Sequence, residues 1–321
     1  MLAVKILQEQ DIEVVGVNFV SNFFDSRVAE RSARHLGLEL KILDISEELL
    51  EMIKKPDHGR GKNLNPCLDC HGFMIRKAKQ ELLSGSPKDC FIATGEVLGQ
   101  RPFSQTKNAL KKVEELAGSE VLRPLSAKLL PVTEIEKQGL VDREKLLDIK
   151  GRSRERQMKL ASEHGIKDYP SPSGGCLLTD PGFSQRLKDM MDKWAVFKPA
   201  DVELLKQGRV FWANQADQNW VLVVVSRDER EGESLMKLKR SGDVLVQLKD
   251  MTGPLILARG LNLDQEKKEW EFNCYIPDKW PADLLSLPER GEQILSTLAL
   301  MAGYYKPEAR GKELKVGLRR D

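Results

Sequence analysis

The sequence has few cysteines, no long apolar run and almost no net charge. Five cysteines in 321 residues are too few for a disulfide scaffold, so in a reducing compartment they are free thiols or metal ligands. No apolar stretch reaches the roughly 18 residues of a transmembrane helix, and the N-terminal segment lacks the features of a signal peptide. We therefore expect a cytoplasmic protein. A charge of +2 does not mark a nucleic-acid binder, so RNA binding would rest on local charge.

Strand and helix signals alternate through the first part of the chain. Mostly apolar runs predict strands at residues 14–20, 40–45, 91–94 and 121–125. Helical spacing separates them at residues 28–36, 47–54, 73–83 and 105–116. This order predicts an α/β domain with a doubly wound, mostly parallel sheet.

The chain begins on a helical segment, residues 2–9, although the first strand of a doubly wound sheet usually precedes the first helix and lies centrally. Two explanations are open: a start placed after that strand, or a natural variant without it. We favour the first, because the flank of the strand at 14–20 would otherwise stay unburied. We thus expect a sheet truncated at its first strand.

The length suggests two domains, at about 100–200 residues per domain. After the first domain, the pattern predicts strands at 208–212, 220–225, 243–248, 254–259 and 314–318, and helices at 229–239 and 293–304. We expect an α/β domain at 1–182, a linker helix at 183–194 and a smaller α+β domain at 195–321.

Three of the cysteines occur in patterns suited to binding a metal. Cys67 and Cys70 form a C-x-x-C pair at a loop-to-helix junction, where a helix N-terminus favours the thiolate form. Cys176 follows two glycines, which let the backbone approach a bulky group. Three thiolates leave a position open for substrate or sulfide, and both zinc and an iron–sulfur cluster stay open. We expect Cys90 in the core, and Cys274 has no partner pattern.

The segment 94–106 follows the expected strand at 91–94. Open α/β sheets bind ligands at the carboxyl ends of their strands, and the glycines, acid and amides here suit a nucleotide. The alternative is an ordinary loop in which Ser104 caps the next helix.

A basic band covers residues 101–160, with 14 Lys and Arg against 9 Asp and Glu, a net +5. We expect residues 137–160 of this band to be helical. Its cluster consists of Arg152, Arg154, Arg156 and Lys159. Arginines bind phosphates through forked hydrogen bonds, which favours an RNA contact, whereas a solvated helix face is the alternative.

Several motifs occur in order: Ala93-Thr94-Gly95-Glu96-Val97-Leu98-Gly99-Gln100, Ser104-Gln105-Thr106 and Leu122-Arg123-Pro124-Leu125. They resemble the tRNA 4-thiouridine synthase branch of the PP-loop ATPases, a family with an adenine nucleotide α-hydrolase-like fold. Together with the two cysteine segments, they are similar to the bacterial subgroup of tRNA thiouridylases in which three cysteines hold a 4Fe–4S cluster. The resemblance covers residues 1–182.

The second domain resembles the NFACT-R type of RNA-binding domain. The matching segments are residues 208–212, 227–235, 242–243, 253–254 and 302–310. Residues 195–321 hold 20 Lys and Arg and 20 Asp and Glu, so phosphate binding there needs a one-sided distribution of charge.

The sequence departs from the family at the phosphate loop. PP-loop enzymes hold the pyrophosphate of ATP with Ser-Gly-Gly-x-Asp-Ser, and this motif does not occur here. The residues after that motif would align with Met1–Val4, so we expect the chain to start just past its phosphate loop. We expect the chain as written to bind ATP weakly or not at all.

The resemblance implies roles for individual residues. Cys67, Cys70 and Cys176 would hold the 4Fe–4S cluster and take part in catalysis. ATP, with Mg²⁺, would be bound near Thr94, Gly95, Gln100 and Phe19. RNA would contact Arg101, Lys128, Arg152, Arg154, Arg156 and Lys159, the first two assigned by charge and position alone.

The implied function is tRNA sulfurtransfer, in which ATP adenylates a uridine carbonyl and sulfur from the cluster replaces the oxygen. The partners would be tRNA and a small-molecule sulfur donor, with no membrane, and a homodimer is left open. Three alternatives remain: a non-catalytic RNA-binding protein, a zinc-stabilised scaffold and a cluster-dependent desulfidase that uses no ATP.

Overall fold

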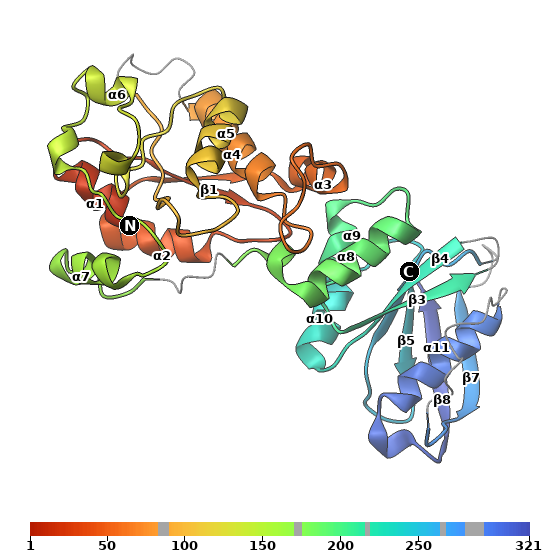
Figure 1. Cartoon of the computed structure of the whole chain (residues 1–321). Helices are drawn as coiled ribbons and strands as arrows, with labels where there is room; N and C mark the ends of the chain where they lie inside the picture. The colour runs from red at the N-terminus through yellow and green to blue at the C-terminus, as the bar shows by residue number, and fades with distance from the viewer. Residues whose placement is uncertain (83–89, 170–174, 216–218, 264–267, 280–291) are drawn as a thin grey trace. The chain divides into compact units, whose positions relative to one another are not determined.

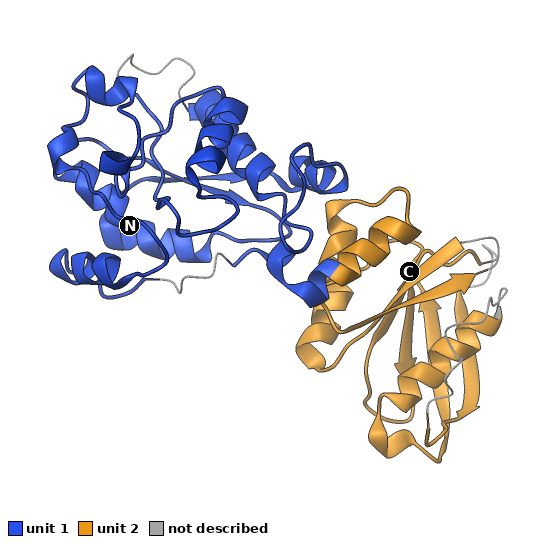
Figure 2. Ribbon diagram, in the orientation of Figure 1, with its two compact units in different colours: residues 1–184 blue, residues 185–321 orange. Residues whose placement is uncertain are grey.

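The computed structural model describes residues 1–82, 90–169, 175–215, 219–263, 268–279 and 292–321. The chain forms two compact units, unit 1 with residues 1–184 and unit 2 with residues 185–321 (Figures 1 and 2). The boundary falls within the helix Pro181–Lys193, in the segment where the sequence predicts a linker helix. Each unit has a hydrophobic core of its own.

Unit 1 is a mixed α/β structure with a small parallel sheet. Its elements are α1 (Leu2–Gln8), β1 (Gly16–Val20), α2 (Arg27–Leu36), β2 (Leu40–Asp44), α3 (Ser46–Lys54), α4 (Cys67–Leu82), α5 (Lys107–Ala117), η1 (Ala127–Leu129), α6 (Glu134–Lys137), η2 (Arg143–Lys145), α7 (Glu155–Glu163) and η3 (Leu177–Thr179). Strand β1 pairs with β2 in parallel, from Gly16 opposite Leu40 to Val20 opposite Asp44. Helix α2 connects them and ends at Gly37, whose φ of 65° suits glycine.

The strands predicted at 91–94 and 121–125 are reduced to a short parallel contact. Ala93 and Leu122 form a single bridge, flanked by two backbone hydrogen bonds of 2.9 Å. Pro124 has no amide hydrogen with which to lengthen this ladder. Among the residues described for unit 1, no hydrogen-bonded sheet is wider than two strands. The mixed α/β class is confirmed, and the doubly wound sheet stays a prediction.

Helices α4 and α5 pack closely against each other. A Cβ placed on Gly72 of α4 would lie 2.6 Å from the Cβ of Leu116 on α5, so only glycine fits at this crossing. Ile75 and Val113 are buried in the same apolar cluster beside the crossing. This packing fixes the position of α4, whose first residue is Cys67.

The helix predicted for residues 137–160 is wrong. The segment is broken into α6, the single turn η2 and α7, which begins only at Glu155. Gly139 and Gly151 adopt left-handed conformations, with φ of 72° and 86°, and these end the helical path. Between them the chain buries apolar side chains such as Ile149 in the core beside α1.

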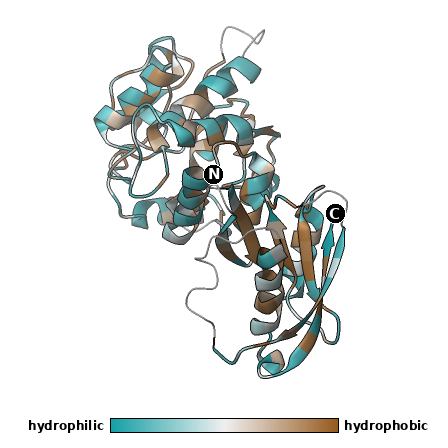
Figure 3. Ribbon diagram, turned by 90° about the vertical axis from the view of Figure 1, so that its right-hand side faces the viewer, coloured by the Kyte–Doolittle hydropathy of each residue, from teal (hydrophilic) through white to brown (hydrophobic). Residues whose placement is uncertain are grey.

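Unit 2 is built around one antiparallel sheet. Its elements are α8 (Pro181–Lys193), α9 (Pro199–Leu204), β3 (Arg209–Gln215), β4 (Asn219–Val225), α10 (Glu229–Leu238), β5 (Val244–Leu248), β6 (Ile256–Arg259), β7 (Glu269–Tyr275), α11 (Glu292–Tyr304), η4 (Pro307–Ala309) and β8 (Glu313–Arg320). The strand order is β3-β4-β6-β5-β8-β7. Helix α11 packs on β5, β7 and β8, and apolar residues gather on the strands (Figure 3). No helix in the described part of the chain is long and apolar enough to cross a membrane.

A buried charge cluster joins β6 to the helical side of unit 2. Arg259, only 1% exposed, donates hydrogen bonds to the Asp243 carboxylate and, at 2.9 Å, to Oδ1 of Asp201. Its Nη2 donates both to the Leu238 carbonyl at 2.7 Å and to Oδ2 of Asp243 at 2.6 Å. A buried arginine is tolerated only when its donors and its charge are matched in this way.

Candidate functional site

The three cysteines of the predicted metal site come from two distant parts of unit 1. Cys67 and Cys70 lie one turn apart at the start of α4, so they share one face of the helix. Cys176 directly precedes η3, after a glycine with φ of 67°. The two parts are tied together because the side chain of Asn63 donates a hydrogen bond to the Thr179 carbonyl at 2.8 Å.

The thiols lie close enough to influence one another electrostatically. Burial raises the pKa of Cys70 to about 12, and the neighbouring Cys176, Cys67 and Asp69 act in the same direction. Burial also raises the pKa of Cys176 to about 11, opposed by a backbone hydrogen bond and by the charge of Arg101. The prediction that the helix N-terminus favours a thiolate is therefore wrong for Cys70, because desolvation outweighs the helix dipole.

The sulfur atoms of the three cysteines are not joined in disulfides. All five cysteines are free thiols, and Nδ2 of Asn65 donates a hydrogen bond to the sulfur of Cys67 at 3.1 Å. Among the described residues, no three His, Cys, Asp or Glu side chains are placed to hold one ion. A cluster makes a different demand, because each cysteine binds its own iron atom. Three half-buried thiols, and an amide that donates to one of their sulfurs, are the groups that would hold such a cluster.

A carboxylate inside the C-x-x-C pair anchors the preceding loop. Asp69 is buried. Its Oδ2 accepts a hydrogen bond from the backbone amide of His58 at 3.1 Å, and its Oδ1 lies 2.6 Å from His58 Nδ1. No pattern in the sequence predicted this pair, because eleven residues separate the partners. The pair holds the polar loop before α4 against the helix that carries Cys67 and Cys70.

A second polar network links the cysteine helix to the predicted nucleotide loop. The carboxylate of Glu96 lies 3.2 Å from His71 Nδ1 and accepts hydrogen bonds from Thr94 Oγ1 and Arg123 Nε, both at 3.1 Å. Burial tends to raise the pKa of Glu96, but His71 and Arg123 outweigh it, and the pKa is lowered. Sequence analysis assigned Thr94 to the nucleotide and counted Glu96 only as an acid suited to the nucleotide loop. It assigned no individual role to Arg123, and Glu96 and Arg123 are the centre of the network.

The loop after Glu96 folds back on itself. The amide of Gly99 donates to the carbonyl of Gln105 at 2.7 Å, and the amide of Gln100 donates to Val97 at 3.1 Å. Gln105 is 6% exposed, and its side-chain oxygen has no hydrogen-bond partner in the described part of the chain. Gly95 is exposed, and no atom lies within 4 Å of where its Cβ would be. This loop therefore offers an open backbone and one buried acceptor.

Three of the six predicted RNA-contacting residues form ion pairs with carboxylates. The pairs are Lys128 with Glu144, Arg156 with Asp148 and Lys159 with Glu163. Arg152 and Arg154 precede α7 rather than lying on a helix face, and Arg101 is exposed in its loop. Exposed ion pairs are weak, so these cations can exchange a carboxylate for a phosphate.

Two other cysteines are placed differently from each other. Cys90 is exposed, so its predicted place in the core is wrong; the short contact at 91–94 does not cover it. Cys274 is buried in β7 of unit 2, where burial raises its pKa. Neither belongs to the three-thiol site.

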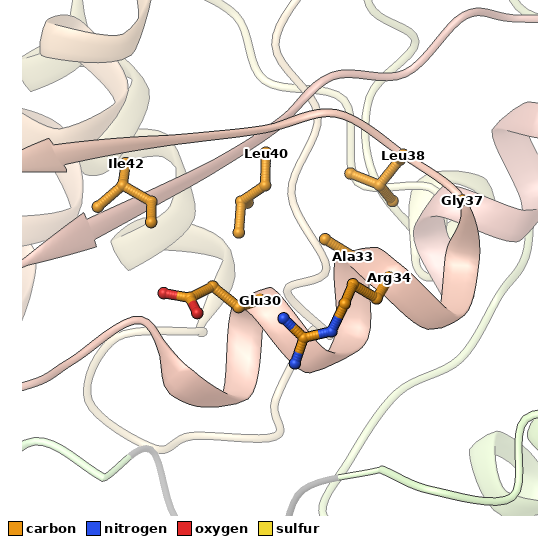
Figure 4. Close-up of a pocket in the computed structure, with 7 residues that line it drawn as sticks. All are labelled: Glu30, Ala33, Arg34, Gly37, Leu38, Leu40 and Ile42. Carbon is orange, nitrogen blue, oxygen red and sulfur yellow. The ribbon is translucent and has the colours of Figure 1, made fainter.

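A shallow pocket of about 330 Å³ lies between α2 and β2, away from the predicted site residues (Figure 4). Its lining residues are Glu30, Ala33, Arg34, Gly37, Leu38, Leu40 and Ile42. Phe19, predicted to face the nucleotide, is half-buried in β1 opposite Leu43 and does not line this pocket.

Comparisons of the chain with protein-family models, with curated proteins and with solved structures gave no match.

Proposed function

We propose that the chain is a tRNA sulfurtransferase that forms thiouridine with ATP and a 4Fe–4S cluster bound by Cys67, Cys70 and Cys176. Because Ser-Gly-Gly-x-Asp-Ser does not occur in this sequence, we expect weak ATP binding, so the reaction would need ATP at high concentration.

The observation that carries the proposal is that the loop before Cys67 and Cys70 is hydrogen-bonded, from Asn63 to the Thr179 carbonyl, to the turn that follows Cys176, so segments more than 100 residues apart are joined beside the three thiols. The raised pKa of Cys70, to which Cys176 and Cys67 contribute, agrees with this. Further support comes from Glu96, which bonds both His71, next to Cys70, and Thr94 of the nucleotide loop. Sulfur and nucleotide chemistry would then be adjacent in unit 1.

A cluster with three cysteine ligands supplies one iron that can hold sulfide for transfer. The residues of the chain prepare this site. The thiols of Cys70 and Cys176 release their protons when they bind metal, because a coordinated thiol is deprotonated even where burial favours the neutral form. The amide of Asn65 stabilises charge on the Cys67 sulfur, and Arg101 offsets negative charge near Cys176.

ATP would convert a poor leaving group into a good one. The uridine carbonyl oxygen attacks the α-phosphate, and pyrophosphate leaves. A sulfur nucleophile then adds to the ring carbon that carries this oxygen, and AMP departs with the oxygen. A C=S bond thereby replaces the C=O bond. Thr94, Gly95 and Gln100 would contact the nucleotide, with Phe19 towards the adenosine, and Mg²⁺ would balance the phosphate charge.

Anaerobic reconstitution with iron and sulfide tests the cysteine assignment. We expect the wild-type chain to take up about four irons and to develop a brown chromophore. The variants C67A, C70A and C176A should each lose most of both, while C90A and C274A serve as matched controls. Full iron content in the three variants would refute the assignment.

A desulfidase is a second candidate, favoured by the lack of Ser-Gly-Gly-x-Asp-Ser in this sequence. Mass spectrometry of tRNA nucleosides separates the two functions. Sulfurtransfer predicts thiouridine that appears only when ATP, a sulfur donor and reconstituted protein are all present. Loss of sulfur from free thiouracil without ATP would instead establish the desulfidase.

A further inference from the structure

The small parallel sheet of unit 1 has a free edge at β2. Strand β2 pairs with β1 on one side, and no other strand in the described part of the chain pairs with its far edge. Its middle residue, Ile42, is 45% exposed, although the strands of a parallel sheet are usually buried. A free edge presents backbone amides and carbonyls that pair readily with another strand, and sheets usually have about four to six strands.

A shallow apolar groove lies beside this edge. It is the pocket between α2 and β2 described above, which we call the α2/β2 groove. Leu38, Leu40 and Ile42 extend from the side of the strand towards helix α2 (Figure 4). Glu30 and Arg34 of α2 also line the groove, one helical turn apart. The edge therefore combines free backbone groups, apolar side chains and two opposite charges.

Glu30 and Arg34 are spaced for an ion pair within the helix but do not form one. An acid followed four residues later by a base commonly pairs on a helix. Glu30 instead accepts a hydrogen bond from the Ser26 hydroxyl, and the ion pairs recorded for the described residues of α2 use Arg27 and Arg31. The groove thus carries a negative and a positive charge that lie apart along the axis of α2.

We propose that a second copy of this chain docks on the β2 edge, related to the first by a two-fold axis that passes beside Ile42 perpendicular to the sheet. Such an axis runs the two β2 strands antiparallel and joins two sheets of two strands into one of four. It places Ile42 opposite its own counterpart, so the apolar side chain exposed in each protomer is covered by its partner.

The charges of the groove favour a second copy over an unrelated strand. The two-fold axis reverses the direction of α2, so Glu30 of one protomer faces Arg34 of its partner, and the reciprocal pair forms at the same time. A two-fold interface has to match itself, because the same patch is used on both sides. A groove with one acid and one base along its length meets that condition.

The inference goes beyond the proposed function, because it needs neither the cysteines nor ATP. The residues that line the groove include none of the three cysteines and none of the predicted nucleotide or RNA contacts. The variant C176A, which would disable sulfur transfer, should therefore dimerise as the wild type does. The two proposals fail separately.

Sedimentation equilibrium of the full chain over a range of protein concentrations tests the interface. We expect a monomer–dimer equilibrium for the wild type. E30R and R34E each bring like charges together twice, and each should weaken dimerisation by at least about tenfold. I42K places a charge at the centre of the interface and should leave only monomer. V28K is the matched control, because Val28 is an exposed valine of the same helix that does not line the groove, and we expect wild-type association.

Exchange of the charges separates a lost contact from a damaged fold. An equimolar mixture of E30R and R34E restores both opposite-charge pairs, and so does the double variant E30R/R34E, so each should dimerise within about threefold of the wild type. A merely structural role of either residue would give no such rescue. Failure of the mixture to associate more tightly than either variant alone would overturn the inference.

Amide hydrogen exchange tests whether the strands themselves pair. The amides of β2 should become better protected as the protein concentration rises, since the dimer gives them new acceptors. A wild-type chain that stays monomeric would overturn the inference. A dimer that I42K leaves intact, or one in which β2 exchanges equally at all concentrations, would overturn it as well.

Discussion

At the scale of single residues, the site depends on buried groups whose charge is set by their neighbours. Burial keeps Cys70 and Cys176 protonated, whereas partners keep Glu96 ionised despite burial. The difference lies in the partners, because Glu96 receives hydrogen bonds from Arg123 and meets His71, whereas Cys70 has negative or neutral neighbours. The thiols would lose their protons only on binding a metal, whereas the carboxylate of Glu96 is already ionised.

The variant E96Q should destabilise unit 1 at neutral pH by about 1–3 kcal/mol, because it removes charged hydrogen bonds to buried Arg123. The pKa of Glu96 is lower in the folded chain than its ordinary 4.5, so its contribution is complete above that value and is lost as the pH falls through the folded pKa. Urea unfolding of both proteins from pH 7 to pH 3 should show the difference shrinking in acid. A constant difference in the free energy of unfolding across that range would contradict this account. The control is T94V, which removes only the Thr94 hydroxyl that donates to Glu96.

Alkylation of the apo protein should follow exposure. Cys90 is exposed, and Cys70 is shielded at the base of α4 with its pKa raised to about 12. Iodoacetamide at pH 7.5 should therefore modify Cys90 at least about tenfold faster, because the thiolate is the nucleophile. Peptide mass spectrometry over time measures both rates, and faster labelling of Cys70 would show that its thiol is activated.

At the scale of elements, the crossing of α4 and α5 positions two of the three thiols. Gly72 allows the crossing, and the short bridge between Ala93 and Leu122 lies next to the network of Glu96. Glycine and proline shape this half of the chain more than strand propensity does. Gly139 and Gly151 break the predicted helix, and Pro124 stops the predicted strand.

Replacing Gly72 by valine should force α4 away from Leu116 and lower the free energy of unfolding by about 1–3 kcal/mol. Because α4 carries Cys67 and Cys70, iron uptake on reconstitution should fall as well. G95A is the control, since open space surrounds a Cβ there and the fold should not change. Thermal unfolding and iron analysis check both variants, and wild-type iron uptake in G72V would separate the crossing from the thiol site.

At the scale of the whole molecule, two units with separate cores carry separate features. Unit 1 holds the three thiols and the loop predicted to bind a nucleotide, and unit 2 holds the buried Arg259 and the contact of Lys193 with two tryptophan rings. Because each unit has its own core, damage to one is expected to leave the other folded.

The variant R259M should destabilise unit 2 by about 3–5 kcal/mol, because it leaves Asp243 buried without its cation and leaves Asp201 with only the half-exposed Arg240. Calorimetry should show one transition moving to lower temperature while the transition of unit 1 stays in place. R227M, which breaks a half-exposed pair with Glu231, should cost no more than about 1 kcal/mol. A shift of both transitions in R259M would mean that the units unfold together.

Features that depend on neighbouring residues could be predicted from the order of residues alone. Periodicity predicted β1, β2 and most of the helices of unit 1, and the C-x-x-C spacing predicted a thiol pair on one helix face. Strand alternation likewise predicted the strands β3, β4 and β5 of unit 2. These features need only local geometry, which the order of residues fixes.

Only the tertiary structure decided which distant residues meet. It joined Glu96 to His71 and Arg123, left Cys90 exposed, and gathered Lys193 with Trp212 and Trp220. No local pattern predicts such contacts, because they depend on how α4, α5 and the strands pack. That packing is decided by contacts throughout the chain. The chemistry of each thiol was therefore readable from its residue type, whereas its protonation was set by the side chains that folding brought beside it.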